Sequence, residues 1–201
     1  LPIYQTTSFV FDSADHAASL FNLQTFGNVY SRLSNPTVAA LEERVAALEC
    51  GRAALASASG MAAEAMALMT ILQQGDHVVA AGALYGGSVS MLSVNLAKFG
   101  ISTTFVDATQ SEAFAAAIRP NTRALFAESL GNPSLQLLDI AAVASVAHAR
   151  GLPLVIDNTV PSPYLCNPIA FGADIVVHSA TKYLAGHGST LGGVMVESGT
   201  F

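Results

Sequence analysis

The sequence predicts an α/β protein built on a mostly parallel, doubly wound sheet. Short apolar or β-branched runs alternate with longer segments whose apolar residues recur at helical spacing. Glycine, proline or charge interrupts each apolar run well before the roughly 18 residues of a membrane span. This alternation is typical of sheets in which helices cross over between parallel strands.

The first predicted helix lies in the segment 35–51. Asn35 is placed to cap it, Pro36 suits its first position, and Gly51 suits the residue that follows its end. Its apolar residues at helical spacing are Val38, Leu41, Val45 and Leu48. The opening thirty residues fit the strand–helix alternation poorly, and residues 1–35 are expected to form an arm.

The rest of the chain continues the alternation. Strands are predicted over 52–57, 77–81, 101–107, 123–129, 152–157, 174–179 and 192–197. Further helices are predicted over 60–74, 87–99, 111–118 and 140–151. Because the chain starts without Met and stops directly after a strand-like run, we expect it to be part of a longer protein.

Composition narrows the classes of function. The net charge is −6 without a basic cluster, which argues against nucleic-acid binding. A hydrophobic content of 52% with only 11% charged residues predicts contacts between subunits. Cys50 and Cys166 are isolated, which fits a reducing cytoplasm, and the five His lack the spacing of metal ligands. Neither a metal nor a membrane is therefore expected.

Ligands of such sheets bind at the carboxyl ends of the strands, so the residues after each strand are the candidate site. One of the two lysines, Lys98, is explained by its place in the last turn of a helix before Gly100. Lys182 follows an apolar strand and precedes a glycine-rich stretch, where this explanation does not apply.

Each candidate site residue has a structural interpretation as well as a functional one. Gly60 and Met61, after Ser59, begin a helix that could hold a phosphate or could simply be capped. Asp157 could hold a cationic ring nitrogen or cap the next segment, and Tyr85 could stack on a flat ligand or pack in the core. The hydroxyl groups that suit an anion are those of Ser179 and Thr181. Taken together with Lys182, these residues match the needs of pyridoxal phosphate, namely a lysine for a Schiff base and an acid for the ring nitrogen.

The sequence resembles the Cys/Met-metabolism family of fold-type-I pyridoxal-phosphate enzymes. SATKYLAGHG (179–188) is similar to the family's lysine signature. YSRLSNPT, ASGMAA, LYGGS and DNT fit in order and spacing, and the resemblance covers nearly the whole chain. It implies a seven-stranded-type sheet with helices on both faces in a large domain, residues 36–201, with the family's small C-terminal domain absent.

The resemblance also implies roles. Lys182 would form the Schiff base and move protons, Tyr85 would stack on the ring, and Asp157 would pair with its nitrogen. Asn132 would lie near the ring hydroxyl. The phosphate would be held by Gly60, Met61, Ser179 and Thr181, and by Tyr30 and Arg32 of a neighbouring subunit, in a tetramer built from dimers that share active sites.

The implied reaction is γ-replacement. The segments around residues 21–37, 128–134 and 177–193 are most similar to those of family members that transfer sulfur from sulfide or a thiol to O-acetylhomoserine. The products would be homocysteine or methionine, and acetate. The family's arginine for the substrate carboxylate has no counterpart here, which predicts cofactor contacts without competent catalysis in these 201 residues alone.

Two alternatives stay open. One is a sister activity, namely cystathionine γ-synthase, methionine γ-lyase or cystathionine γ-lyase. The other is a non-catalytic cofactor- or nucleotide-binding module, although GHGSTLGG is not GxGxxG and does not open an early helix.

Overall fold

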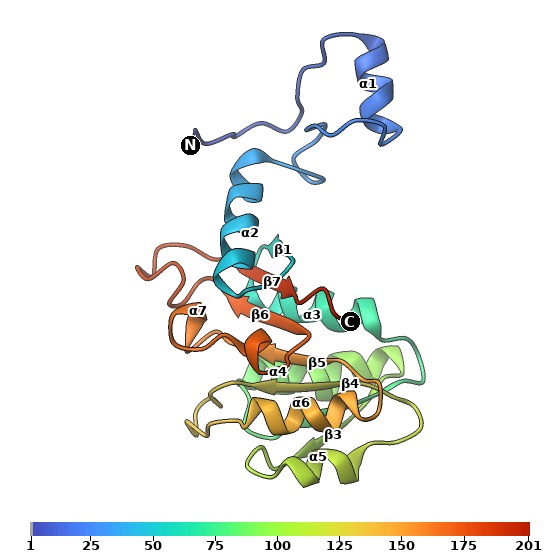
Figure 1. Ribbon diagram of the computed structural model, residues 1–201, viewed down its shortest axis with the longest axis vertical. Helices are drawn as coiled ribbons and strands as arrows, with labels where there is room; N and C mark the ends of the chain where they lie inside the picture. The colour runs from blue at the N-terminus through green and yellow to red at the C-terminus, as the bar shows by residue number, and fades with distance from the viewer. Residues whose placement is uncertain (1) are drawn as a thin grey trace. The chain divides into compact units, whose positions relative to one another are not determined.

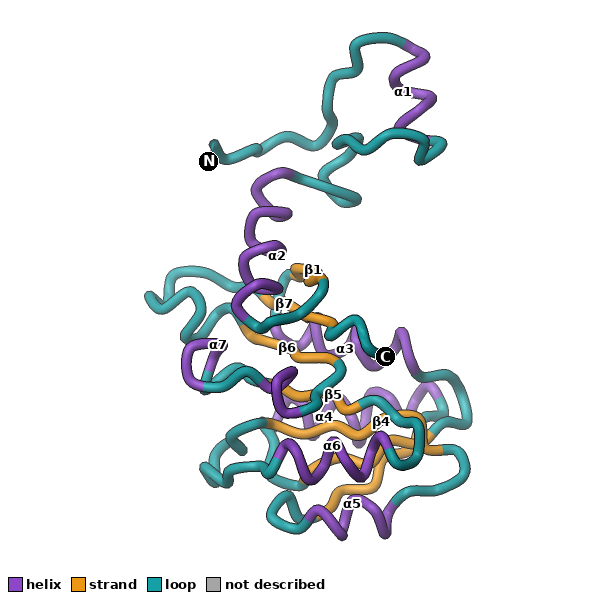
Figure 2. Tube along the Cα trace, in the orientation of Figure 1, coloured by secondary structure: helices purple, strands orange, loops and turns teal. Residues whose placement is uncertain are grey.

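The computed structural model of the chain describes residues 2–201. Within them, strands and helices alternate along most of the chain (Figure 2). The strands are β1 (Ala53–Ser57), β2 (His77–Ala81), β3 (Ser102–Val106), β4 (Thr122–Glu128), β5 (Leu154–Asp157), β6 (Ile175–Ser179) and β7 (Gly193–Glu197). The α-helices are α1 (Ala14–Phe21), α2 (Pro36–Leu48), α3 (Gly60–Ile71), α4 (Gly86–Ser90), α5 (Ser111–Ala117), α6 (Ile140–His148) and α7 (Ser162–Leu165).

The seven strands form one sheet in the order β1-β7-β6-β5-β4-β2-β3. Pairs among β2, β3, β4, β5 and β6 are parallel, and β7 runs antiparallel to both β1 and β6. The predicted mostly parallel sheet is thus confirmed. The antiparallel β7 was not foreseen, because periodicity reports that a strand is present but not its direction.

Helices cover both faces of this sheet, as predicted. In Figure 1, α5 and α6 lie in front of the sheet, while α3 and α4 lie behind it. The crossovers through α3 and α4 lead toward the β3 edge, and those through α5 and α6 lead back toward β1. The direction of winding therefore changes between the neighbouring strands β2 and β4. Such a switch point is where α/β sheets of this kind open a crevice for ligands.

The core lies between the sheet and these helices. Residues of β2, β4 and β5 are buried along their whole length, with the exception of Arg123, as expected for central parallel strands. Phe114 of α5 and Phe126 of β4 are the largest fully buried side chains of the described residues. This rigid centre fixes the positions of the strand ends.

Two predicted details differ from the structure. The residue with left-handed backbone after α2 is Cys50, with φ 58°, and not Gly51. Gly51 is instead required by packing, because a Cβ there would lie 2.3 Å from Val196 Cγ1. The predicted helix 87–99 is helical but consists of α4, a π-helix over Met91–Asn95 and a 3-10 helix over Leu96–Phe99.

The chain divides into two compact units, of which the first ends at Arg44 and the second starts at Val45. The first unit contains α1, which the sequence did not predict, and an antiparallel bridge between Ser8 and Tyr30. Asn35 caps α2 as expected, since its Oδ1 accepts the N–H of Thr37 at 2.9 Å. The predicted arm of residues 1–35 therefore lies within a unit that extends nine residues further.

Candidate active site

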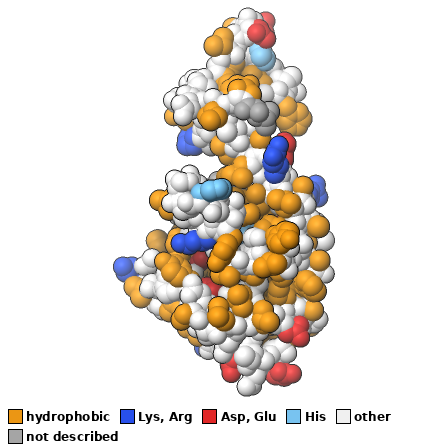
Figure 3. All heavy atoms as spheres, turned by 90° about the vertical axis from the view of Figure 1, so that its left-hand side faces the viewer, with side chains coloured by type: hydrophobic (Ala, Val, Ile, Leu, Met, Phe, Trp, Pro, Cys, Tyr) orange, Lys and Arg blue, Asp and Glu red, His pale blue; other side chains and the backbone are white. Residues whose placement is uncertain are grey.

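A cavity of about 230 Å³ lies where the carboxyl ends of β4, β5 and β6 meet the start of α3. Figure 3 looks at this edge and shows acidic side chains set in a recess beside a basic one. Eight of the ten predicted site residues line the cavity, and they are Gly60, Met61, Tyr85, Asn132, Asp157, Ser179, Thr181 and Lys182. Residues far apart in sequence therefore meet at one place because they all follow strands of one sheet.

Lys182 stands three residues after β6, in a tight turn. Its backbone N–H donates to the carbonyl of Ser179 at 3.2 Å, and its own carbonyl accepts the N–H of Gly186 at 2.9 Å. Gly186 has φ 74°, the left-handed conformation that glycine adopts without strain. The turn presents the lysine amine at the open side of the cavity, where the side chain is exposed in the single chain.

The N-terminus of α3 provides donors for an anion. Ser59 caps this helix, since its Oγ accepts the N–H of Ala62 at 3.2 Å. Gly60 and Met61 belong to the first helical turn, whose N–H groups have no intrahelical acceptor. A Cβ on Gly60 would lie 2.6 Å from the Cβ of Ser179, so glycine allows the helix to approach the end of β6. Backbone donors and the Ser179 hydroxyl are thereby brought to one spot suited to phosphate.

Hydrogen bonds fix the ends of β5 and β6 relative to each other. Asp157 Oδ1 accepts the N–H of Thr159 at 2.8 Å, and Thr159 Oγ1 accepts the N–H of Ser179 at 2.8 Å. Thr181 Oγ1 donates to the carbonyl of Gly192 and accepts its N–H, at 3.2 and 3.1 Å. Asp157 is buried. The chain Asp157–Thr159–Ser179 links the candidate acid to the candidate phosphate ligand.

Two buried carboxyl groups of the cavity were missed by the sequence reading. Glu64 of α3 is only 3% exposed, and burial, followed by the charge of Asp157, raises its pKa to about 9. Its Oε1 accepts the hydroxyl of Ser88 at 3.0 Å, whereas its Oε2 has no partner among the described residues. Burial and the neighbouring Asp157 therefore favour the protonated form of the Glu64 carboxyl.

The second missed group is Glu128, the last residue of β4. Its Oε1 accepts the N–H of Tyr85 at 2.6 Å, and its Oε2 accepts the N–H of Asn132 at 3.0 Å. Burial raises the pKa of Glu128 to about 7, while the bond from Tyr85 opposes the rise. Its sequence signal is the one that marked Asp157, namely an acid at the end of an apolar strand.

Tyr85 and Asn132 flank the cavity and are both exposed in the single chain. The ring of Tyr85 lies against Gly87, where an added Cβ would be 2.4 Å from Tyr85 Cε1. The ring can occupy this position only because residue 87 carries no side chain. Tyr85 presents a flat aromatic surface, and Asn132 an amide, on the open side of the cavity.

Tyr30 and Arg32 do not line this cavity. They belong to the N-terminal unit, where the Arg32 guanidinium lies 5.5 Å from the centroid of the Tyr30 ring. Their predicted role concerns the site of a neighbouring subunit. That role stays a prediction.

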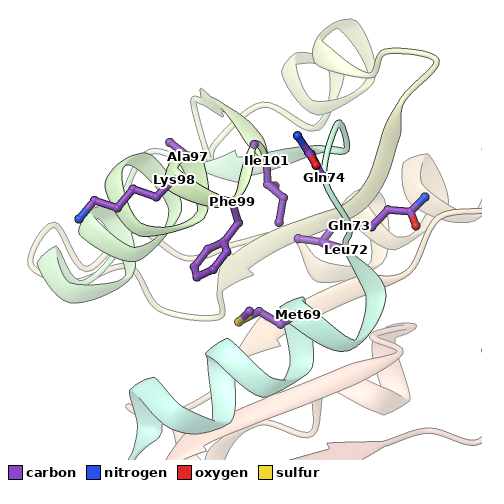
Figure 4. A pocket seen from close by; sticks show the side chains of 9 residues that line it. Met69, Leu72, Gln73, Gln74, Ala97, Lys98, Phe99 and Ile101 are labelled. Atoms are coloured by element: carbon purple, nitrogen blue, oxygen red, sulfur yellow. The ribbon is translucent and has the colours of Figure 1, made fainter.

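Outside this cavity, the described residues bring together fewer functional side chains. Figure 4 shows a second cavity, lined by the end of α3 and by residues 97–101. These residues precede β2 and β3, so the second cavity lies at the amino ends of the strands. Lys98 is its one charged side chain among the described residues and points away from the others. No group of three or more His, Cys, Asp or Glu side chains within residues 2–201 could hold a metal ion. None of the helices within that range is long and apolar enough to span a bilayer.

The sequence was compared with protein families and with known proteins. A model of the Cys/Met metabolism PLP-dependent enzyme family matches residues 1–201. The O-acetyl-L-homoserine sulfhydrylase of Leptospira meyeri is 57% identical over 201 residues, which are 100% of this chain and 46% of the relative. The chain therefore spans about half the length of the curated relatives it matches.

Two solved structures share the fold. A protein of Campylobacter jejuni described as an O-acetylhomoserine (thiol)-lyase, which carries N'-pyridoxyl-lysine-5'-monophosphate, superposes with a TM-score of 0.95 at 40% identity. It is matched over 100% of this chain and 49% of its own. The cystathionine gamma-lyase of Lactobacillus plantarum, in complex with L-serine, gives a TM-score of 0.90 at 39% identity, over 98% of this chain and 49% of its own.

Proposed function

Because this chain belongs to the Cys/Met metabolism family of PLP-dependent enzymes, we propose that it forms the cofactor-binding part of an enzyme of γ-replacement. The reaction takes O-acetylhomoserine and sulfide, or a thiol, to homocysteine, or methionine, and acetate. One observation carries the proposal: Lys182, Asp157 and the N-terminus of α3 converge on one cavity. The 57% identity to the sulfhydrylase of Leptospira meyeri supports the choice of substrate.

The residues present fit pyridoxal phosphate. The cofactor's phosphate matches the N–H groups of Gly60 and Met61 with the hydroxyls of Ser179 and Thr181, and its ring nitrogen matches the Asp157 carboxylate. The unpartnered Glu64 Oε2 beside Asp157 shows that this end of the cavity is polar although buried. When bound, the cofactor supplies an electron sink for negative charge at the substrate Cα.

The chain's own residues then hold and move protons. The Lys182 amine is a base on a flexible side chain, and it can take a proton from Cα and return one at a later step. The buried Asp157 carboxylate stabilises a cationic ring nitrogen through its charge. The aromatic face of Tyr85 orients the flat ring, and the amide of Asn132 suits the ring hydroxyl.

The assembly of the whole protein is part of the proposal. Exposed apolar side chains on α2, including Leu41 at 44% and Leu48 at 58%, fit burial against another subunit. In a tetramer built from dimers that share active sites, Tyr30 and Arg32 reach the phosphate of the neighbouring subunit. We place the enzyme in the cytoplasm and retain 1–35 as the arm and 36–201 as the large domain.

Borohydride reduction of the natural-length protein, followed by peptide mapping, tests the proposal. We expect a pyridoxyl adduct on Lys182 that is lost in Lys182→Ala and kept in Lys98→Ala, since these are the two lysines of the sequence. Unmodified Lys182 after incubation with excess cofactor overturns the proposal. Three separate assays, with O-acetylhomoserine plus sulfide, with cystathionine and with methionine, distinguish the activities. γ-Replacement releases homocysteine in the first assay, whereas the sister lyases release ammonia from cystathionine or methionine.

A further inference from the structure

The carboxylate of Glu128 connects two loops that flank the cavity. One loop leaves β2 and carries Tyr85, and the other leaves β4 and carries Asn132. The bonds have lengths of 2.6 and 3.0 Å and use both carboxylate oxygens. We call this three-residue arrangement the Glu128 bridge.

The bridge spans the switch point of the sheet. After β2 the chain turns to the face covered by α4, and after β4 it turns to the face covered by α6. No strand hydrogen bond can hold the two loops together once they part. Their backbones still approach closely, because a Cβ on Gly131 would lie 2.8 Å from the carbonyl oxygen of Ala83. The Glu128 bridge is the polar link across this gap.

The environment of Glu128 is unfavourable for a charged carboxylate. Glu128 is buried, and the negative charge of Asp157 lies close enough to disfavour its ionised form, which together raise its pKa to about 7. A glutamine would avoid this repulsion but offers one acceptor oxygen and would turn its NH₂ group toward the second N–H donor. Two converging donors therefore require the two acceptors of a carboxylate.

We propose that Glu128 is a positioning residue, which fixes Tyr85 and Asn132 at the cavity through the backbone of each. The inference rests on the proposed function, in which these two side chains contact the cofactor. Glu128 itself acts through the two loops, because its carboxylate oxygens are occupied by their N–H groups.

The test compares the natural-length protein with Glu128→Gln and Glu128→Asp by amide hydrogen exchange and by steady-state kinetics. Asp76→Asn is the matched control, because Asp76 is also buried and its Oδ2 accepts a backbone N–H, from Gln73 at 2.8 Å, at the far end of β2. Glu128→Asp keeps two acceptors on a shorter side chain, so it separates acceptor number from side-chain length.

In Glu128→Gln we expect the amides of Tyr85 and Asn132 to exchange about tenfold faster. We also expect kcat to fall by about tenfold or more, with a smaller change in KM, since both loops are displaced from the reacting groups. Glu128→Asp should recover part of both effects, and Asp76→Asn should leave the exchange of Tyr85 and Asn132 unchanged.

Exchange and kcat within twofold of wild type in Glu128→Gln would overturn the proposal. So would a uniform acceleration of exchange across the sheet, which marks a loss of stability alone. Should Glu128→Gln fail to fold, the same readouts on Glu128→Asp decide. Failure of the proposed function is detected separately, because the wild-type protein would then form no adduct on Lys182. In that case the amide hydrogen exchange of Tyr85 and Asn132 in wild type and Glu128→Gln still tests the Glu128 bridge.

Discussion

Glu49 and His178 form a pair that is completely buried, with Glu49 Oε1 at 2.6 Å from His178 Nε2. Glu49 follows α2, and His178 lies in β6 directly before Ser179. The same Oε1 accepts the side-chain N–H of Asn158 at 2.9 Å, and Asn158 directly follows Asp157. The pair therefore supports the ends of both strands that supply the candidate acid and phosphate ligand.

Removal of one partner of this pair should be strongly destabilising. In Glu49→Leu, His178 and Asn158 each lose a buried acceptor, and we expect the free energy of unfolding to fall by about 1–3 kcal/mol for each of the two groups. The double variant Glu49→Leu/His178→Leu should lose less than the sum of the single variants. Urea unfolding of the four proteins provides the measurement, and strictly additive losses would contradict a direct coupling.

The charge of Asp157 should matter more for catalysis than for cofactor retention. In Asp157→Asn the side chain keeps its size and can still accept the N–H of Thr159, but it cannot stabilise a cationic ring nitrogen. We expect kcat to fall on the order of 10²-fold, with the adduct on Lys182 still formed. Peptide mapping and kinetics on the same preparation check both parts, and an unchanged kcat would remove Asp157 from the site.

Gly60 should be intolerant of a side chain. In Gly60→Ala the new Cβ would lie 2.8 Å from the Cα of Ser179, so backbone must move, and we expect a loss of about 1–3 kcal/mol in stability. Affinity for pyridoxal phosphate should fall as well, because the α3 donors shift away from Ser179. Gly86→Ala is the control, since nothing lies within 4 Å of its added Cβ. Thermal unfolding and cofactor titration of both variants distinguish a local clash from a general effect of alanine.

The cofactor-free protein should lose stability as the pH rises. The pKa of Glu64 is raised from 4.5 to about 9, so the folded state binds this proton more tightly than the unfolded state. Its contribution is complete below about pH 4.5 and declines up to about pH 9, by at most about 1.4 kcal/mol per pH unit.

Urea unfolding at pH 6 and pH 8 tests this sign. Wild type should lose up to about 3 kcal/mol relative to Glu64→Gln between these values, because the amide carries no titrating proton. Parallel pH dependences in the two proteins would show that Glu64 is ionised in the folded state.

Much of the site could be predicted because its residues follow strands. Lys182, Asp157 and Tyr85 stand where apolar runs end, and a parallel sheet brings such ends together. Glu64 was missed because it lies inside a helix, although it is the single charged residue of the apolar segment 60–71. Glu128 was missed although it shows the same pattern as Asp157, because its partners are backbone groups that carry no sequence signal.

The order and direction of the strands could not be predicted from the sequence, because strand pairing also leaves no signal in the periodicity. Periodicity identified β7 but not its antiparallel pairing with β1 and β6, which depends on the path of the connection over residues 180–192. The apolar stripe of α2 was assigned correctly to a helix. Val45 of that stripe is buried while Leu48 is exposed, so the stripe alone did not tell core from surface.

The pairing of β1 with β7 has a consequence for biosynthesis. β1 has β7 as its only neighbour in the sheet, and β7 starts at Gly193, 136 residues after β1 ends at Ser57. At roughly 5–20 residues per second, a ribosome takes on the order of ten seconds to make that stretch. During this interval the backbone of β1 has no strand partner on the nascent chain, so this strand stays open to a holding chaperone until β7 has been made.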